Sequence, residues 1–299
     1  MRRFWCWAPC LVALAAVGAL SRAGEPRAAG TVKIGMLKSM FRDVPPGMFA
    51  VLSKPFHSLV ETQTGLKGEL CLIDGPDALR KELAEDKVQL GVFHGFEYAW
   101  MRLRQPDLRP LMLAVGQPGC LRAMLVVPAG EAGVQSFADL RGKTLALPRG
   151  TRENTRLFLE RQAAHDGQTL EQFFGQVITP ADPAHALNEV AKGAAQATVT
   201  DAATLACFKD TYPGQGRRLK VLAESEPFPA TVIAYREGSL SAEALRKFRD
   251  GMSHAHNTTQ GGNLMMLLKM SRFEPIPADY EALLAEILKA YPPPGPPAE

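Results

Sequence analysis

Two apolar runs, RAMLVVP at residues 122–128 and ATVIAYR at residues 230–236, decide the fold of this 299-residue chain. Both are rich in aliphatic and β-branched side chains, a composition that is typical of buried strands. The segment between them is long enough to form a complete strand-and-helix unit. We therefore predict that the chain leaves a first lobe, builds a second and returns, so that two crossing strands form a hinge over a cleft.

Strand and helix patterns alternate outward from these two runs. Strands are predicted at residues 31–37, 68–73, 88–93 and 108–115 before the first run, and at residues 143–148, 176–179, 195–200 and 219–224 between the two. Helices are predicted between these strands, and three more, at residues 241–254, 262–271 and 279–291, follow the second run. This alternation favours an α/β fold with two mostly parallel sheets, each flanked by helices, joined by a two-strand hinge.

The same patterns divide the chain into segments. Residues 31–126 and 231–299 are predicted to form lobe I and residues 127–230 an inserted lobe II, with a ligand cleft between the lobes. Residues 1–23 have the pattern of a secretory signal peptide, because Arg2 and Arg3 precede an apolar core at residues 11–20 that is too short to span a bilayer well. We expect this signal to be cleaved and the protein to be periplasmic or otherwise secreted; an uncleaved N-terminal anchor is the alternative.

Charge and cysteine content narrow the classes of partner. Removing residues 1–23 takes away three arginines and no acids, so the formal charge falls from +3 to zero and no nucleic-acid partner is expected. Cys71, Cys120 and Cys207 remain, without CxxC spacing or a disulfide framework. One disulfide is possible in an oxidising compartment, and three buried thiols are the interpretation we favour. We expect no metal and no cofactor.

Candidate binding residues follow the predicted strands, because ligands of open parallel sheets lie beyond the carboxyl ends of the strands. Four junctions supply them: Met40 and Phe41 after residues 31–37, His94 and Phe96 after residues 88–93, Thr151, Arg152, Asn154 and Thr155 after residues 143–148, and Asp201 after residues 195–200. Two of these junctions belong to each predicted lobe. We therefore expect all four to face one shared cleft.

The junction after residues 143–148 is the richest in hydrogen-bond donors. A helix start at residue 151 presents free amides to an anion, and the threonine hydroxyls and arginines nearby add further donors. An ordinary helix cap with solvated arginines is the alternative. His94 can equally be a structural histidine, Asp201 can cap its own helix, and Phe41 can cover the ligand or plug its lobe.

Catalytic motifs are not evident in the sequence. It contains no GxSxG elbow, no HExxH pair and no GxxxxGK[ST] phosphate loop, and its histidines are scattered. We therefore expect a protein that binds a ligand without transforming it. An enzyme on the same fold is a weaker alternative, which a turnover assay distinguishes.

Several longer stretches resemble a known family. They include DALRKELAEDKVQLGVFHGFEYAW at residues 77–100, SFADLRGKTLALP at residues 136–148 and HALNEVAKGAAQATVTDA at residues 185–202. In their order and spacing the chain resembles the phosphate/phosphite/phosphonate-binding-protein-like family of ABC-transporter substrate-binding proteins, over nearly all of residues 31–291. The resemblance implies the type II periplasmic binding protein fold, with an anion bound at the helix start near residues 150–155.

These observations together predict a solute-binding protein of an ABC transporter. It closes like a clamshell on a small anionic ligand, of phosphate or phosphonate type, and presents the closed form to a permease in the inner membrane. We expect it to be a monomer. A periplasmic sensory module that feeds a receptor or kinase is the alternative, because fold alone does not fix function.

Overall fold

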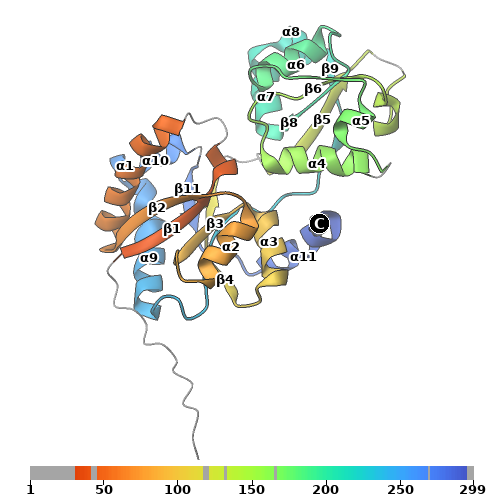
Figure 1. Cartoon of the computed structure of the whole chain (residues 1–299). Helices are drawn as coiled ribbons and strands as arrows, with labels where there is room; N and C mark the ends of the chain where they lie inside the picture. Colours follow the sequence, from red (N-terminus) through yellow and green to blue (C-terminus); the bar gives the residue numbers. More distant parts are fainter. Residues whose placement is uncertain are drawn as a thin grey trace, which may run out of the picture.

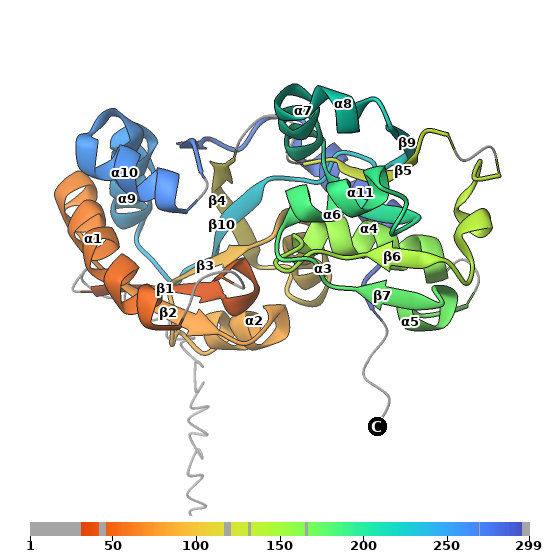
Figure 2. The same cartoon turned by 90° about the horizontal axis from the view of Figure 1, so that it is seen from above.

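Two β-sheets lie in separate lobes of the molecule, each with helices against both faces (Figures 1 and 2). The computed structural model describes residues 31–41, 46–116, 121–130, 133–164, 167–268 and 270–294. The predicted signal peptide and Cys120 lie outside these residues. Within the described ranges, none of the helices has the length and hydrophobicity needed to cross a membrane.

The sheet of lobe I has six strands in the order β11-β4-β10-β3-β1-β2. Their bounds are β1 Thr31–Leu37, β2 Lys67–Ile73, β3 Leu90–Phe93, β4 Leu108–Val115, β10 Thr231–Arg236 and β11 Arg272–Glu274. One face packs against α1 (Pro46–Thr64), α9 (Ala242–His254) and α10 (Thr259–Leu267), and the other against α2 (Pro76–Ala84), α3 (Gly95–Arg104) and α11 (Tyr280–Ala290). Strands β1 to β4 run in one direction, and β10 and β11 run in the other.

The sheet of lobe II has five strands in the order β7-β6-β8-β5-β9. Their bounds are β5 Ala123–Pro128, β6 Thr144–Ala146, β7 Gln176–Ile178, β8 Ala197–Asp201 and β9 Leu219–Glu224. Helices α4 (Glu153–Ala164) and α5 (Leu170–Phe173) pack on one face, and α6 (Pro183–Ala191), α7 (Ala202–Thr211) and α8 (Pro213–Gly216) lie on the other side. Only β5 runs against the other four strands. Both sheets are mixed, because three of the five neighbouring pairs in lobe I and two of the four in lobe II are antiparallel, more than the sequence predicted.

Local sequence explains the main elements, as helix α9 illustrates. Its stretch AEALRKFRDGMSH buries Ala244, Phe248 and Met252, which recur every four residues and form one apolar face. The hydroxyl of Ser241 accepts a hydrogen bond from the Ala244 N–H and caps the helix. The apolar face packs against the lobe I sheet, where Phe248 and Met252 reach the ligand cleft.

The two crossing segments form a paired ribbon between the lobes. The Phe228 N–H donates to the Leu121 carbonyl at 2.8 Å, and the Ser225 N–H donates to the Ala123 carbonyl at 2.9 Å. The predicted lobe boundary at residue 126 is wrong by several residues, because strand β5 from Ala123 onward pairs with β8 and β9 of the second sheet. The first crossing therefore ends before Ala123.

Short elements account for most of the other differences from prediction. Strand β11 and the four-residue helices α5 and α8 were not predicted, because segments this short contain no full period of either pattern. The predicted helix at residues 262–271 instead spans Thr259–Leu267 and gives way to β11. The expectation of buried thiols is wrong for Cys207, which is exposed on α7, whereas Cys71 is partly buried in β2 and both are free.

Candidate ligand-binding site

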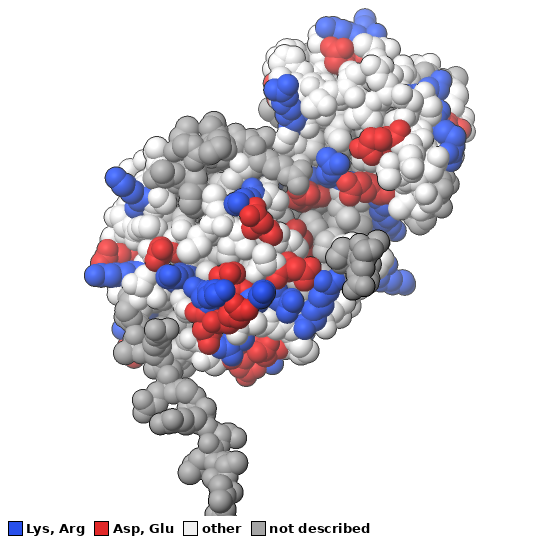
Figure 3. Space-filling view, viewed as in Figure 1, with Lys and Arg blue, Asp and Glu red and all other residues white. Residues whose placement is uncertain are grey.

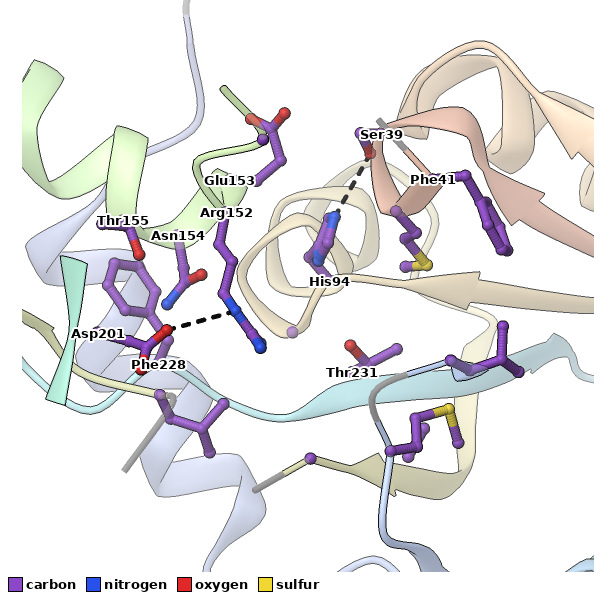
Figure 4. Close-up of a pocket in the computed structure, with 18 of the residues that line it drawn as sticks. Ser39, Phe41, His94, Arg152, Glu153, Asn154, Thr155, Asp201, Phe228 and Thr231 are labelled. Carbon is purple, nitrogen blue, oxygen red and sulfur yellow. Dashed lines mark hydrogen bonds and ion pairs between the residues drawn. The ribbon is translucent and has the colours of Figure 1, made fainter. Parts of the chain in front are cut away.

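A cavity of about 990 Å³ lies between the two lobes (Figure 4). It brings together all nine residues that the sequence singled out: Met40, Phe41, His94, Phe96, Thr151, Arg152, Asn154, Thr155 and Asp201. They come from four strand-to-helix junctions, two in each lobe, as predicted. The polar residues gather mainly on the lobe II wall, and the aromatic and aliphatic ones on the lobe I wall.

A tight turn places the start of α4 at the cavity. Gly150 has φ +66°, a left-handed conformation that glycine adopts without steric cost. The backbone N–H and the hydroxyl of Thr151 both donate to the Pro148 carbonyl, the hydroxyl at 2.7 Å. The proton of the Thr151 hydroxyl is thus engaged within the turn, and a ligand contact from this residue stays a prediction.

The first turn of α4 faces the cavity. The Arg152 carbonyl accepts from the Arg156 N–H at 2.9 Å, so the amides that follow Arg152 are those that lack an acceptor within the helix. The aligned peptide dipoles add partial positive charge at this end of the helix. This geometry favours an anion at the lobe II wall of the cavity.

Three polar groups around this turn have no hydrogen-bond partner among the described residues. They are the hydroxyl groups of Thr155 and Thr200 and the side-chain nitrogen of Asn154. Thr155 is 2% exposed and Thr200 5% exposed, and both residues line the cavity. Buried polar groups in folded proteins are nearly always paired, so these three groups leave hydrogen-bond capacity at this helix end for a polar partner.

An ion pair crosses the polar wall. Nε of Arg152 lies 3.6 Å from Oδ2 of Asp201, and the Asp201 side chain is 8% exposed against 42% for Arg152. The other carboxylate oxygen of Asp201 accepts from the Thr204 N–H at 2.8 Å, so the alternative that it caps its own helix, α7, is confirmed. Figure 4 shows the Arg152 side chain extending from the start of α4 into the space between the lobes.

A second carboxylate lines the same wall. Asp182 caps α6, where the backbone N–H of His185 donates to it at 2.9 Å. This hydrogen bond lowers the pKa of Asp182, and the His185 side chain, with Nδ1 2.7 Å from Asp182, lowers it further. Glu153 lines the same wall, so Arg149 and Arg152 share it with three acidic residues, Glu153, Asp182 and Asp201.

The lobe I wall is built on the ends of β1 and β3. The Ser39 hydroxyl lies 3.4 Å from Nε2 of His94, whose ring stacks on Phe96 with centroids 5.8 Å apart. Phe96 in turn makes edge contacts with Trp100 and with Phe228 of the return crossing. This aromatic cluster connects the cavity to the hinge.

The hinge backbone also touches this wall directly. A Cβ atom at Gly95 would lie 2.5 Å from the Pro229 carbonyl oxygen, so only glycine allows the return crossing to approach the first turn of α3 this closely. Movement of the hinge therefore bears on the residues beside Gly95, His94 and Phe96.

Some lining residues were missed by the sequence reasoning. They include Ser39, Asp182, Thr200, Phe228 and Thr231. Thr200 directly precedes Asp201 at the end of a strand, a position that could have been included. Phe228 and Thr231 belong to the return crossing and reach the site only through the fold.

Comparison with known families identifies the chain. A family model described as "ABC transporter, phosphonate, periplasmic substrate-binding protein" matches residues 48–280. The chain belongs to this family. Membership agrees with the resemblance read from the sequence and places the chain among substrate-binding transport proteins, a family of periplasmic binders rather than of enzymes. No curated protein sequence matches the chain.

Solved structures share the fold of this family member at low sequence identity. A Xanthomonas citri protein bound to ATP is 15% identical, with a TM-score of 0.62, and the match covers 88% of this chain and 97% of that one. A binding protein component of an ABC phosphonate transporter from Pseudomonas aeruginosa is 15% identical, with a TM-score of 0.56 and coverage of 87% and 86%. PhnD1 of Prochlorococcus marinus in complex with methylphosphonate is 13% identical, with a TM-score of 0.55 and coverage of 88% and 98%. The predicted type II periplasmic binding protein fold is thus confirmed.

Charged side chains outside the cleft are intermixed. On the face shown in Figure 3, basic and acidic groups alternate across lobe I. Around α2, for example, Arg104 pairs with Asp77 at 2.8 Å and Lys87 with Glu85 at 2.8 Å. Exposed pairs of this kind contribute little to stability, and they leave this face without a field of a single sign.

Proposed function

We propose that this protein captures a small phosphonate-like anion between its lobes and delivers it to an ABC permease of the inner membrane. It does so as a periplasmic monomer, after export and removal of residues 1–23. Family membership supports the transport role, and the cavity supports the nature of the ligand. Closure of the lobes over the bound ligand supplies the form that the permease recognises.

One observation carries the ligand assignment. The unpartnered groups of Asn154, Thr155 and Thr200 surround the first turn of α4, and Arg152 extends over the same space. Hydroxyl, amide and guanidinium groups all donate hydrogen bonds, as do the helix amides. A tetrahedral oxyanion has acceptor oxygens in several directions and satisfies such a set at once.

The remaining side chains have complementary roles. Asp201 keeps Arg152 oriented and accepts a hydrogen bond from a protonated oxygen or an ammonium group of the ligand. Ser39 and His94 approach from lobe I and add polar contacts when the lobes close. Met40, Phe41 and Phe96 exclude water from the closed cleft, which strengthens the polar interactions inside it.

Calorimetric titration with methylphosphonate and inorganic phosphate tests the proposal. Both should bind the wild type, and Arg152→Ala should weaken binding about 10- to 100-fold through loss of a charge-assisted hydrogen bond. Arg246→Ala is the matched control, because Arg246 is exposed on α9 outside the cavity. Absence of binding by either anion, or equal affinity of the two variants, overturns the proposal.

A further inference from the structure

The cavity extends from the polar wall into an apolar chamber in lobe I. Strand register defines its floor as two rows of side chains. Met36, Val92 and Ile233 are neighbours across β1, β3 and β10. The second row consists of Thr231, Ala114 and Phe273, which are neighbours across β10, β4 and β11. Thr231 lies two residues before Ile233 on β10, so this row is closer to the start of that strand. All six line the cavity.

The chamber has depth as well as a floor. Ile34 also lines it and lies two residues before Met36 on the same face of β1, about 7 Å further into the lobe. Phe248 and Met252 of α9 cover it from the opposite side, together with Met40, Phe41 and Met270. Ile34, Phe248 and Met252 are at most 1% exposed and close the end of the chamber, whereas Met36, Ala114 and Phe273 of the floor are 6–8% exposed and border the cavity.

An unfilled apolar chamber opposes stability. Core walls that border a cavity lose dispersion contacts, and stability falls as the residual volume grows. Methylphosphonate fills only part of the 990 Å³ cavity, which includes the space between the lobes, and its single methyl group covers little of these side chains. Four of the walls are methionines, Met36, Met40, Met252 and Met270, whose flexible side chains adapt to apolar groups of different shape.

We propose that the ligand is amphiphilic: its anionic head occupies the start of α4 and an alkyl or aryl substituent fills the chamber of lobe I. The class is that of alkyl- or aryl-phosphonates and the corresponding phosphate monoesters. This inference rests on the proposed function, because it uses the same head site. The arrangement spans both lobes, so one ligand molecule contacts the two walls that must close on each other.

A chain-length series tests the inference. Titration of the wild type with methyl-, butyl- and hexylphosphonate should show rising affinity, by about fourfold for each methylene that is buried. We expect hexylphosphonate to bind at least about 30-fold more tightly than methylphosphonate. 1-Hexanol, which has the tail without the head, should bind at least about 100-fold more weakly than hexylphosphonate.

Variants that fill the chamber separate tail from head. Ala114→Met and Ile233→Phe each add side-chain volume to the chamber floor from neighbouring strands, so one serves if the other disturbs folding. Both should abolish the gain from the hexyl chain and leave methylphosphonate affinity within about twofold. Ala282→Met, at an exposed position of α11, is the matched control and should leave the whole series unchanged.

The outcomes distinguish the two proposals. Equal affinity across the series, with binding retained, overturns the amphiphilic ligand and leaves anion capture intact. A chain-length gain that survives in both filled variants also overturns the assignment of the chamber. If no phosphonate binds, both proposals are overturned. If 1-hexanol binds as tightly as hexylphosphonate, the anionic head contributes nothing to affinity and its assignment to the start of α4 is overturned.

Discussion

Thr155 shows at the scale of one residue how binding and stability diverge. Its hydroxyl is buried without a partner among the described residues. Such a group loses its hydration on folding and recovers nothing until a ligand arrives. An ordinary core threonine stabilises the fold through the hydrogen bond of its hydroxyl. At Thr155 the corresponding hydrogen bond forms only when a ligand binds, so it contributes to affinity instead.

We therefore predict opposite effects of Thr155→Val on folding and on binding. Valine keeps the shape and removes the orphan hydroxyl, so the free energy of unfolding of the empty protein should stay equal or rise. Affinity for methylphosphonate should fall about 3- to 10-fold, the cost of one neutral hydrogen bond. Urea denaturation and calorimetric titration measure the two quantities.

Thr198→Val is the matched control on strand β8. The Thr198 hydroxyl donates to the Ala146 carbonyl at 2.7 Å in the core of lobe II. Its loss should lower the free energy of unfolding by about 1 kcal/mol and leave affinity unchanged. If Thr155→Val behaves in the same way, its hydroxyl serves the fold and not the ligand.

The turn before α4 is the element that aims the binding groups. Gly150→Ala should cost about 1–2 kcal/mol of stability, because alanine disfavours a φ of +66°. Relaxation of this strain shifts the first turn of α4, so affinity for methylphosphonate should also fall, by about 3- to 10-fold. Gly193→Ala, at φ +80° after α6, should cost similar stability without any loss of affinity. If Gly150→Ala binds methylphosphonate as tightly as Gly193→Ala does, the turn does not position the site.

The segment after α11 ties both lobes to the hinge. The Tyr291 carbonyl accepts from Nε1 of Trp100 in lobe I at 2.8 Å. The Tyr291 hydroxyl donates to Glu226 at 2.9 Å, and Arg161 of lobe II donates to both oxygens of Glu226 at 2.9 Å. Burial opposes the ionised form of Glu226, but these hydrogen bonds and its own backbone N–H prevail and lower its pKa.

This network predicts a pH-dependent contribution to stability. Because the pKa of Glu226 is lowered on folding, its stabilisation is complete above the unfolded-state value of about 4.3 and is lost as the pH falls through the folded-state value. The stability difference between wild type and Glu226→Gln should thus be constant near neutral pH and shrink in acid. Thermal denaturation as a function of pH measures it.

Tyr291→Phe provides the companion test for this network. Without the tyrosine hydroxyl the pKa of Glu226 should be lowered less, so the same comparison in the Tyr291→Phe background should show a smaller dependence on pH. An identical pH profile in both backgrounds would show that the hydroxyl does not act on Glu226.

We expect the whole molecule to close on its ligand, since the cavity lies between two lobes that the hinge ribbon and the Tyr291 segment connect. We predict that saturating methylphosphonate reduces the radius of gyration of protein lacking residues 1–23, as measured by small-angle scattering. Trp100, the single tryptophan after residue 23, contacts the cavity residue Phe96, and its fluorescence should change in parallel. Arg152→Ala at the same concentration should show neither change, and an unchanged radius in the saturated wild type would count against closure.

The sequence by itself determined the two-lobed α/β architecture and predicted nine of the residues that line the cavity. Its signals are local: period-two runs predict strands, amphipathic periods predict helices, and the rule that ligands lie beyond strand ends selects the junctions. The strand register and the boundary of the first crossing could not be predicted accurately from the sequence. Residues at a crossing have the same apolar composition whichever sheet they join, as the misplaced limit at residue 126 shows.

Only the tertiary structure decided how the site is divided into a polar and an apolar half. Ala114, Thr231 and Phe273 are distant in sequence and adjacent through strand pairing alone. Likewise, the sequence could not show that the Thr151 hydroxyl is engaged within its turn while that of Thr155 is not. Hydrogen-bond satisfaction and cavity shape depend on which distant groups approach one another, and side-chain periodicity along a single chain does not contain that information.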